Sequence, residues 1–173
     1  MPGFDIESFR GNFTGGAKSY LFSYVPMIPT GGNAEMMSYL VNSTSLPANA
    51  IEEVPVTWQG FDFKMAGKSS YVAWDVVFRV DKDAEIRASF EQWQRFIHDP
   101  TSNVYSSPSQ YMMDQHVTLL SDSGGEICTY DIIGAWPSAI SDVPLDYTST
   151  DLAVFTVSFT YQYHTMNKVS YDQ

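Results

Sequence analysis

The chain of 173 residues has no long hydrophobic run, a single cysteine and few basic residues. No apolar stretch approaches the roughly 18 residues of a membrane-spanning helix, and residues 1–15 lack the features of a signal peptide, so we expect a soluble chain without a membrane anchor. The lone Cys128 excludes an internal disulfide, and its place in the apolar run 127–133 predicts burial. Nine Lys and Arg stand against 20 Asp and Glu, a net charge of -11 without a basic stripe, which argues against tight DNA binding.

The residue types that carry catalysis or bind metals are sparse and scattered. Segment 81–83 lacks the glycine and distal glutamate of a calcium loop, so we assign its acids to the start of a helix. Residues 11–19 do not fit a phosphate loop, because the lysine comes one residue late and no buried strand precedes it. Neither a GxSxG nor an HExxH motif occurs. We expect no catalytic, cofactor-binding or metal site, and the three histidines lack partners at ligand spacing: His98, His116 and His164.

Alternation of apolar and polar side chains predicts about eight strands in one packed domain. Hydrophobic residues make up 44% of the chain and aromatics 15%, enough for a single core. The two most regular segments each have one apolar face. In segment 71–80 it carries Trp74, Val76, Phe78 and Val80, and in segment 153–163 it carries Phe155, Val157, Phe159, Tyr161 and Tyr163. The predicted strands are 18–25 with its partner 36–44, 54–58 with 61–65 across a Gln59-Gly60 turn, 71–80, 114–120 with 127–133, and 153–163.

The pattern changes to a helical period over residues 83–98. Ile86, Phe90, Trp93 and Ile97 recur at steps of four, three and four, which places them on one stripe. Asp81 or Asp83 can cap the start of this helix, and Pro100 ends it. On the wet side, Arg87 with Glu91 and Glu91 with Arg95 are spaced for ion pairs.

These elements predict a mainly β protein: an antiparallel β-sandwich or small barrel with one α-helix packed on its outside. We expect a single domain over residues 1–173, with an N-terminal arm (1–16) that orders only against something else and a frayed C-terminal tail (165–173). Segment 101–110, between the predicted helix and the strand 114–120, is predicted to be a loop. The long strand 153–163 is predicted to be an edge that a neighbouring subunit must cover.

Seven landmarks follow one another in an order that resembles the tail tube proteins of contractile-tailed (myovirus) bacteriophages. The resemblance covers residues 18–163. It departs where the family often has Leu and Trp and this chain has Ala135 and Tyr147, and the turn over 30–37 is longer. The landmarks are Thr44-Ser45-Leu46-Pro47, Val54-Pro55-Val56, Ala66-Gly67, Trp74, a helix with Trp93, Gly134-Ala135-Trp136-Pro137, and Leu145-Asp146-Tyr147.

The resemblance implies a fold shared with the tube protein of type VI secretion, and a structural role. Six subunits would close into a ring, and rings would stack into a conduit for viral DNA, which passes without specific binding. The partners implied are the tail sheath, tape measure, baseplate and tail terminator proteins, in a virion tail assembled in the host cytoplasm. A tube subunit of a type VI or related contractile secretion system is the alternative, followed by a monomeric ligand-binding β-sandwich and an enzyme.

The resemblance also implies two sites on this chain. The first is a ring-stacking hairpin over 46–67, with Leu46, Pro47, Glu52, Glu53, Pro55 and Gly67 at the contact; an ordinary surface hairpin is the alternative. The second is a channel lining of uncharged polar side chains, for which solvated outer surface is the alternative: Thr156, Ser158, Thr160 and Gln162. A lumen without a lysine or arginine ring would repel phosphate and let DNA pass, although salt screens that force beyond about 8 Å.

Overall fold

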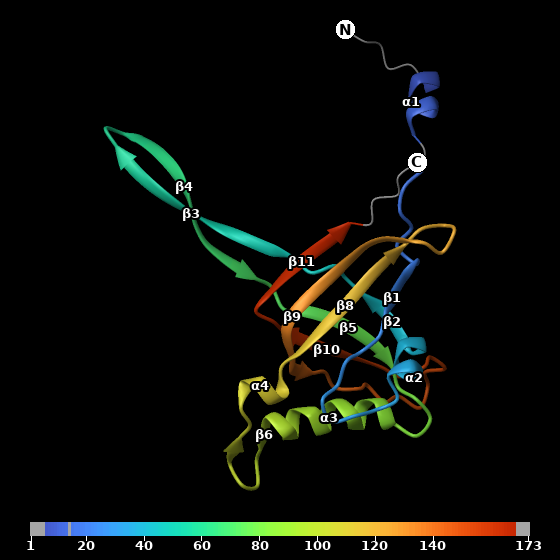
Figure 1. The fold of residues 1–173 in the computed structure, drawn as a ribbon. Helices are drawn as coiled ribbons and strands as arrows, with labels where there is room; N and C mark the ends of the chain where they lie inside the picture. The colour runs from blue at the N-terminus through green and yellow to red at the C-terminus, as the bar shows by residue number, and fades with distance from the viewer. Residues whose placement is uncertain (1–5, 14, 169–173) are drawn as a thin grey trace.

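The computed structural model describes residues 6–13 and 15–168 and is built around one folded antiparallel sheet (Figure 1). The strand order is β1-β8-β9-β10-β5-β2, and β11 pairs with β9 off this path. The long strand β9 joins two halves of the sheet, because its first part pairs with β8 and β11 and its last part with β10. The strands are β1 (Phe22–Tyr24), β2 (Val41–Thr44), β5 (Trp74–Arg79), β8 (Met113–Leu120), β9 (Glu126–Ile140), β10 (Val154–Thr160) and β11 (Tyr163–Lys168). The predicted mainly antiparallel β fold is confirmed.

Apolar side chains of β5 and β10 form the centre of the core, and helix α3 (Glu85–Ile97) packs against them. The register places Phe155 opposite Phe78 and Phe159 opposite Trp74. The ring centroid of Phe90 lies 5.0 Å from that of Phe78 and 6.3 Å from that of Phe155. The predicted strand faces and helical stripe are confirmed by the side chains that are almost completely buried: Trp74, Val76, Phe78, Ile86, Phe90, Trp93, Phe155, Val157 and Phe159.

Asp81 fixes the start of α3. One of its carboxylate oxygens accepts from the Glu85 N–H at 2.9 Å and the other from the Ile86 N–H at 3.2 Å. These bonds satisfy two of the N–H groups that the first turn of a helix leaves unpaired. The helix begins at Glu85 and ends at Ile97, slightly inside the predicted range 83–98. The capping prediction is confirmed for Asp81.

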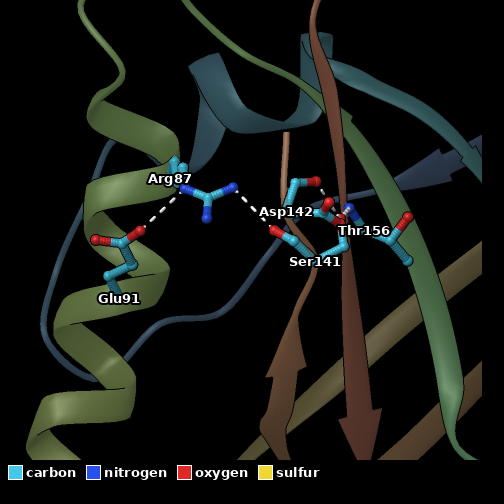
Figure 2. Close-up of polar contacts among 5 residues, drawn as sticks. All are labelled: Arg87, Glu91, Ser141, Asp142 and Thr156. Carbon is cyan, nitrogen blue, oxygen red and sulfur yellow. Dashed lines mark hydrogen bonds and ion pairs between the residues drawn. The ribbon is translucent and has the colours of Figure 1, made fainter. Parts of the chain in front are cut away.

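Arg87 ties α3 to the sheet, as Figure 2 shows. Its Nε donates to Glu91 Oε1 at 2.9 Å, and its Nη1 donates to the backbone oxygen of Ser141 at 3.0 Å. The Ser141 hydroxyl accepts from the Thr156 N–H on β10 at 2.9 Å and donates to the backbone oxygen of Asp142. The helix, the end of β9 and the start of β10 therefore share one hydrogen-bonded chain.

A buried amide on β8 holds the segment that follows β1. Gln115 is fully buried, and its Oε1 accepts from the Tyr24 hydroxyl at 2.9 Å and the Met27 N–H at 3.0 Å. Its Nε2 donates to the Met27 backbone oxygen at 2.7 Å. Burial raises the pKa of Tyr24 well above its ordinary value, which keeps the phenol protonated as a donor. Buried polar groups of this kind are tolerated only when all are hydrogen-bonded.

The first third of the chain corrects two predictions. Residues 34–39 form helix α2 (Ala34–Tyr39) rather than the start of a strand, because Asn33 Oδ1 caps the Met36 N–H at 3.1 Å. β2 begins only at Val41 and pairs with β5, whereas β1 pairs with β8. The predicted pairing of 18–25 with 36–44 is therefore wrong, and the strand predicted over 18–25 is shortened to Phe22–Tyr24.

The last third corrects the position of the long strand. Segment 153–163 is divided into β10, which ends at Thr160, and β11, which begins at Tyr163. β10 lies between β9 and β5 and is hydrogen-bonded on both sides, so the prediction that it is an exposed edge is wrong. Tyr161 is buried as predicted, whereas Tyr163 is 47% exposed.

Segments predicted to be irregular contain short elements. The arm includes helix α1 (Ile6–Asn12), and residues 165–168, predicted to fray, belong to β11. The rest of the predicted arm and tail at 1–5, 14 and 169–173 lies outside the described residues. The predicted loop 101–110 includes β7 (Val104–Tyr105), which pairs with β6 (His98–Asp99), and the start of α4 (Pro108–Tyr111). Cys128 is free and buried, as predicted.

Candidate assembly surfaces

A two-stranded hairpin, β3 (Asn49–Trp58) and β4 (Phe61–Tyr71), projects from the body of the molecule (Figure 1). The predicted turn at its tip is confirmed, since Gln59 and Gly60 both adopt positive φ, 49° and 83°. β4 extends to residue 71, so the predicted end of this strand at Met65 is wrong. Two-stranded ribbons are marginally stable alone, which makes the surface of this hairpin the first candidate for an interface.

One face of the hairpin is entirely apolar. The register places Val54 opposite Met65, Val56 opposite Phe63 and Trp58 opposite Phe61, and because side chains alternate, all six point to the same side. Their exposed fractions run from 47% to 71%. We call these six residues the apolar hairpin face: Val54, Val56, Trp58, Phe61, Phe63 and Met65.

The apolar hairpin face is large for a surface left to solvent. Trp58, Phe61 and Phe63 are 71%, 70% and 60% exposed. At about 150–250 Å² for a whole aromatic side chain, these three alone present roughly 400 Å² of apolar surface. That is as much as the largest apolar patch on a typical monomer, and such patches mark interaction sites.

The opposite face of the hairpin is polar. Lys64 Nζ lies 2.9 Å from Glu53 Oε2, and the Thr57 hydroxyl donates to Asp62 Oδ1 at 2.6 Å. Pro55 is placed opposite Lys64 on this face. Both groups of the ion pair are more than 60% exposed, so the pair contributes little to stability. The hairpin is thus amphipathic, and its two faces suit different surroundings.

Hydrogen bonds at the base of the hairpin fix its direction. The Tyr161 hydroxyl donates to the backbone oxygen of Ala48 at 3.2 Å, and Trp74 Nε1 donates to that of Ser45 at 2.6 Å. The ring of Tyr71, at the end of β4, lies edge-on to His164 at 5.5 Å. Burial and the nearby Tyr71 raise the pKa of Tyr161, so its hydroxyl stays a donor. The body of the molecule therefore fixes the base of the hairpin, while the apolar hairpin face extends into solvent.

The structure divides the predicted stacking residues among three places. Leu46, 41% exposed, and the buried Pro47 precede β3 at the root, and Glu52 is exposed at the bulge that follows Ile51. Glu53 and Pro55 lie on the polar face and Gly67 on β4. Their role in stacking stays a prediction. None of them is on the apolar hairpin face, although the alternation of Val, Val, Trp and Phe, Phe, Met over 54–65 could have identified it.

Gly67 has a steric role in this hairpin. A Cβ at this position would lie 2.8 Å from Val54 Cγ2 and 3.0 Å from the Glu52 backbone oxygen. The register of β3 and β4 shifts between Ile51 and Glu53, and Gly67 permits the close approach of the strands there.

The two end strands of the sheet are a second candidate surface. Within the described residues, β1 pairs only with β8 and β2 pairs only with β5, so each has a side free of strand pairing. A groove of about 690 Å³ lies between them, with Tyr20 and Ser23 on one wall and Tyr39 and Asn42 on the other. Unpaired strand edges are sites where another chain can add a strand.

The predicted channel-lining residues lie on the face of the sheet away from the core. Thr156, Ser158 and Thr160 alternate with the buried residues of β10, whereas Gln162 is exposed and lies between β10 and β11. The neighbouring strand adds charge to this face: Asp75 pairs with Ser158, whose hydroxyl donates to its carboxylate at 2.5 Å, and the exposed Arg79 pairs with Val154. On β5 and β10 this face therefore carries hydroxyls, one aspartate and one arginine, together with the apolar Val77 and Val154.

Chemical sites are not evident in the part of the chain that the structure describes. No group of three or more His, Cys, Asp or Glu side chains in residues 6–13 and 15–168 is placed to hold a metal ion. No helix in those ranges is long and apolar enough to cross a membrane. The exposed apolar hairpin and the sheet edges are therefore the candidate surfaces for contact with other chains.

Comparison with protein families and curated relatives gives consistent matches. A family model described as "Phage tail tube protein" matches residues 16–167. The tail tube protein of Serratia phage KSP90 is 27% identical over 113 residues, which cover 65% of this chain and 64% of that protein. Tail tube protein gp19 of Enterobacteria phage T4 is 22% identical over 129 residues, covering 73% of this chain and 79% of the relative.

Solved structures with the same fold come from contractile injection systems. A chain of the anti-feeding prophage (AFP) baseplate matches with a TM-score of 0.70 and 14% identity over 92% of this chain and 100% of its own. A chain of the PVC sheath/tube terminator in its extended state matches with a TM-score of 0.69 and 18% identity over 90% and 99%. At these identities the likeness establishes the fold.

Proposed function

This chain belongs to the phage tail tube protein family, and we propose that six copies of it close into a ring and that the rings stack into the inner tube of a contractile phage tail. The subunit's role is structural, and we assign it no catalytic activity. Its place is the virion tail, with assembly in the host cytoplasm. The tube provides the conduit through which viral DNA leaves the particle.

The observation that carries this proposal is the exposed apolar hairpin face. The hairpin, held at its root, exposes roughly 400 Å² of aromatic surface to water. Hydration of this surface is unfavourable in free energy, and a neighbouring subunit that covers it removes the unfavourable contribution. The free sides of β1 and β2 give the same argument for lateral contacts, because strand addition between subunits satisfies them and ring closure leaves none exposed. The hairpin then supplies stacking and the sheet edges supply closure.

The remaining partners follow from the family. The sheath surrounds the tube, the tape measure protein occupies its lumen during assembly, and the baseplate and tail terminator proteins lie at its ends. In support, the chains with this fold include those of a baseplate and of a sheath/tube terminator. The net charge of -11 favours solubility of the free subunit before assembly.

We propose that the outward face of β10 lines the channel. Thr156, Ser158 and Thr160 present hydroxyls that water can solvate without holding phosphate tightly. Each subunit adds one Asp75 and one Arg79 to this face, so a ring of six carries equal numbers of both charges. Asp75 and Arg79 thus add no net charge to this surface, but the expectation of a lumen without arginine does not fit this face.

A tube subunit of a contractile secretion or injection system is the second candidate, favoured by the fold shared with anti-feeding prophage and PVC chains. Neighbouring genes separate the two: portal and tape measure genes indicate a phage, and secretion ATPase or membrane-complex genes indicate the alternative.

Negative-stain electron microscopy of the concentrated protein, with sedimentation velocity across a dilution series, tests the proposal. Sixfold rings or hollow tubes are the expected result. A protein that stays monomeric at the highest concentration, with or without purified baseplates as a seed, would overturn the proposed function.

A further inference from the structure

Helix α1 presents a second unpartnered apolar surface, away from the hairpin. Ile6 and Phe9 of α1, and Phe13 directly after the helix, are 72%, 62% and 59% exposed, and their spacing places them on one side. The rings of Phe9 and Phe13 stack with centroids 5.2 Å apart. Arg10 is exposed and borders this stripe. The family match begins at residue 16, so α1 is a feature of this chain outside the matched region.

Neither α1 nor the projecting part of the hairpin is stabilised by packing of its apolar side against another element. A helix of seven residues is too short to persist in water through its own hydrogen bonds. A two-stranded ribbon needs a third strand or a helix against its apolar face. A helix laid across a two-stranded sheet meets both requirements at once, and helix on sheet is one of the few stable layer arrangements.

We propose that α1 of one subunit packs on the apolar hairpin face of a neighbouring copy. This inference rests on the proposed tube, and it names the surface that covers the hairpin. In this contact Phe9 and Phe13 lie over Val56 and Phe63, and Ile6 extends the apolar contact along the ribbon. About 10 Å of helix matches the roughly 13 Å of the apolar strand segment 54–58.

Charge supports the same pairing. Glu52 borders the apolar face near the bulge in β3 and is exposed. Among the described residues it forms no ion pair, whereas the adjacent Glu53 is bound to Lys64. Arg10 is the cation next to the apolar stripe of α1. The docked helix therefore brings Arg10 toward Glu52.

The contact is between different copies because of where the two elements leave the body. Figure 1 shows α1, which precedes β1 in the chain, on one side of the body and the hairpin extending in another direction, with their tips well apart. Two different patches on separate sides of one molecule form a head-to-tail interface, and one that does not close on itself repeats along a filament, as stacking of rings requires. Residues 13–21 separate α1 from β1 and can span up to about 30 Å, so the helix can reach a neighbour.

The contact is too small to form a dimer unaided. The exposed apolar surface of both partners amounts to roughly 600–900 Å², below the about 1,200 Å² of a specific stable interface. It consequently forms only where strand pairing has already positioned the subunits. Dilute subunits should lack it, and assembled tubes should contain it.

Crosslinking between two proteins that each carry one added cysteine tests the contact. Phe9→Cys protein and Phe63→Cys protein are mixed, assembled and treated with a short bis-maleimide, and a dimer that contains one of each is expected on a denaturing gel. The buried Cys128 gives the background, which wild-type tubes measure. The matched control replaces Phe63→Cys with Lys64→Cys, the neighbouring position on the polar face. The same mixture kept dilute should give no dimer.

The outcomes separate the two proposals. Tubes of the mixture without the mixed dimer, or with as much dimer from Lys64→Cys, overturn the α1 contact and leave the proposed function standing. An internal crosslink in dilute Phe9→Cys/Phe63→Cys double variant shows that α1 covers its own hairpin, which also overturns it. Wild-type protein that forms neither rings nor tubes overturns the proposed function.

If the cysteine variants do not assemble, exchanging the charges of Arg10 and Glu52 tests the contact between α1 and the hairpin. Arg10→Glu should raise the concentration needed for tube formation about tenfold, since it places a like charge beside Glu52. Adding Glu52→Arg to that variant should restore assembly. No increase with Arg10→Glu, or no restoration in the double variant, contradicts the contact.

Discussion

Replacement of Phe63 with serine is the most direct test of how the hairpin contributes to assembly. Phe63 lies at the middle of the apolar hairpin face and is 60% exposed in the single chain. The subunit alone should hardly notice the change, because substitutions at exposed positions alter the free energy of unfolding by about 0.5 kcal/mol or less. The assembled tube should lose the contact in which a neighbouring subunit covers the phenyl ring of Phe63.

The magnitude follows from the exposed area. An aromatic side chain presents about 150–250 Å², so 60% exposure leaves on the order of 120 Å² for a partner to bury. At about 25 cal/mol per Å² this is roughly 3 kcal/mol for each contact. A loss of that size raises the concentration at which tubes appear by about a hundredfold.

The matched control is Glu53→Ser, on the polar face of the same hairpin. Because the Glu53–Lys64 pair is exposed, its loss should cost about 0–1 kcal/mol and change the assembly concentration by at most about fivefold. Sedimentation velocity and electron microscopy across a dilution series measure assembly, and thermal unfolding of the dilute protein measures the subunit. Equal assembly of Phe63→Ser and wild type would refute the reasoning, as would a large drop in the melting temperature of dilute Phe63→Ser.

Three further predictions concern the subunit itself. Gly67→Ala should lower the free energy of opening of the β3–β4 hairpin by about 1–3 kcal/mol and speed amide hydrogen exchange in β3 and β4 alone. Unchanged exchange there would show that the strands accommodate the Cβ without strain. Gln115→Leu should lower the free energy of unfolding by about 2–4 kcal/mol in urea titration, because the buried Tyr24 hydroxyl loses its acceptor, and a loss below about 1 kcal/mol would contradict this. Hydrogen bonds from Thr101 lower the pKa of Asp99 to about 2, so the carboxylate's contribution to the 99–102 loop is present above the ordinary Asp pKa and lost as pH falls toward 2. NMR titration of Asp99 should show a midpoint near 2, and a midpoint of about 4 would mean the loop bonds are absent in solution.

The elements that the sequence predicted well are those whose burial pattern depends on local spacing. Alternation over β5 and β10 and the stripe on α3 each place large side chains on one face, so periodicity alone identifies them. Asp81 could be predicted as a cap because the capping geometry needs only residues next to it. The same holds for the tight turn at Gln59 and Gly60.

Strand partners could not be predicted in the same way, because pairing joins residues far apart in the chain. The predicted neighbour of 18–25 was the next apolar segment, yet β1 pairs with β8, almost a hundred residues later. Segment 34–39 carries apolar residues compatible with either helix or strand, and the Asn33 cap decides for helix. β10 was placed at an edge only because the sequence does not reveal that β5 and β9 lie on both sides of it.

The candidate site shows the same division. The hairpin could be located from the order of the landmarks, but only the register shows that Glu53 and Pro55, predicted at the stacking contact, lie on its polar face; their role stays a prediction. Register also brings Arg79 and Asp75 beside a strand face that carries only hydroxyls in the sequence.

That juxtaposition changes what a channel lining must do. Along β10 alone, the outward face is uncharged, and DNA would meet a wall with no attraction. Across the sheet, Arg79 and Asp75 lie on the same strand β5, four residues apart, so about 13 Å separates their backbones and each keeps a local field within the roughly 8 Å screening distance. A ring built from this face in the proposed channel would therefore carry six of each charge at separate positions on its wall. If this face lines the channel as proposed, Arg79, held one strand away from the hydroxyls, is the group of β5 and β10 that would attract phosphate most strongly.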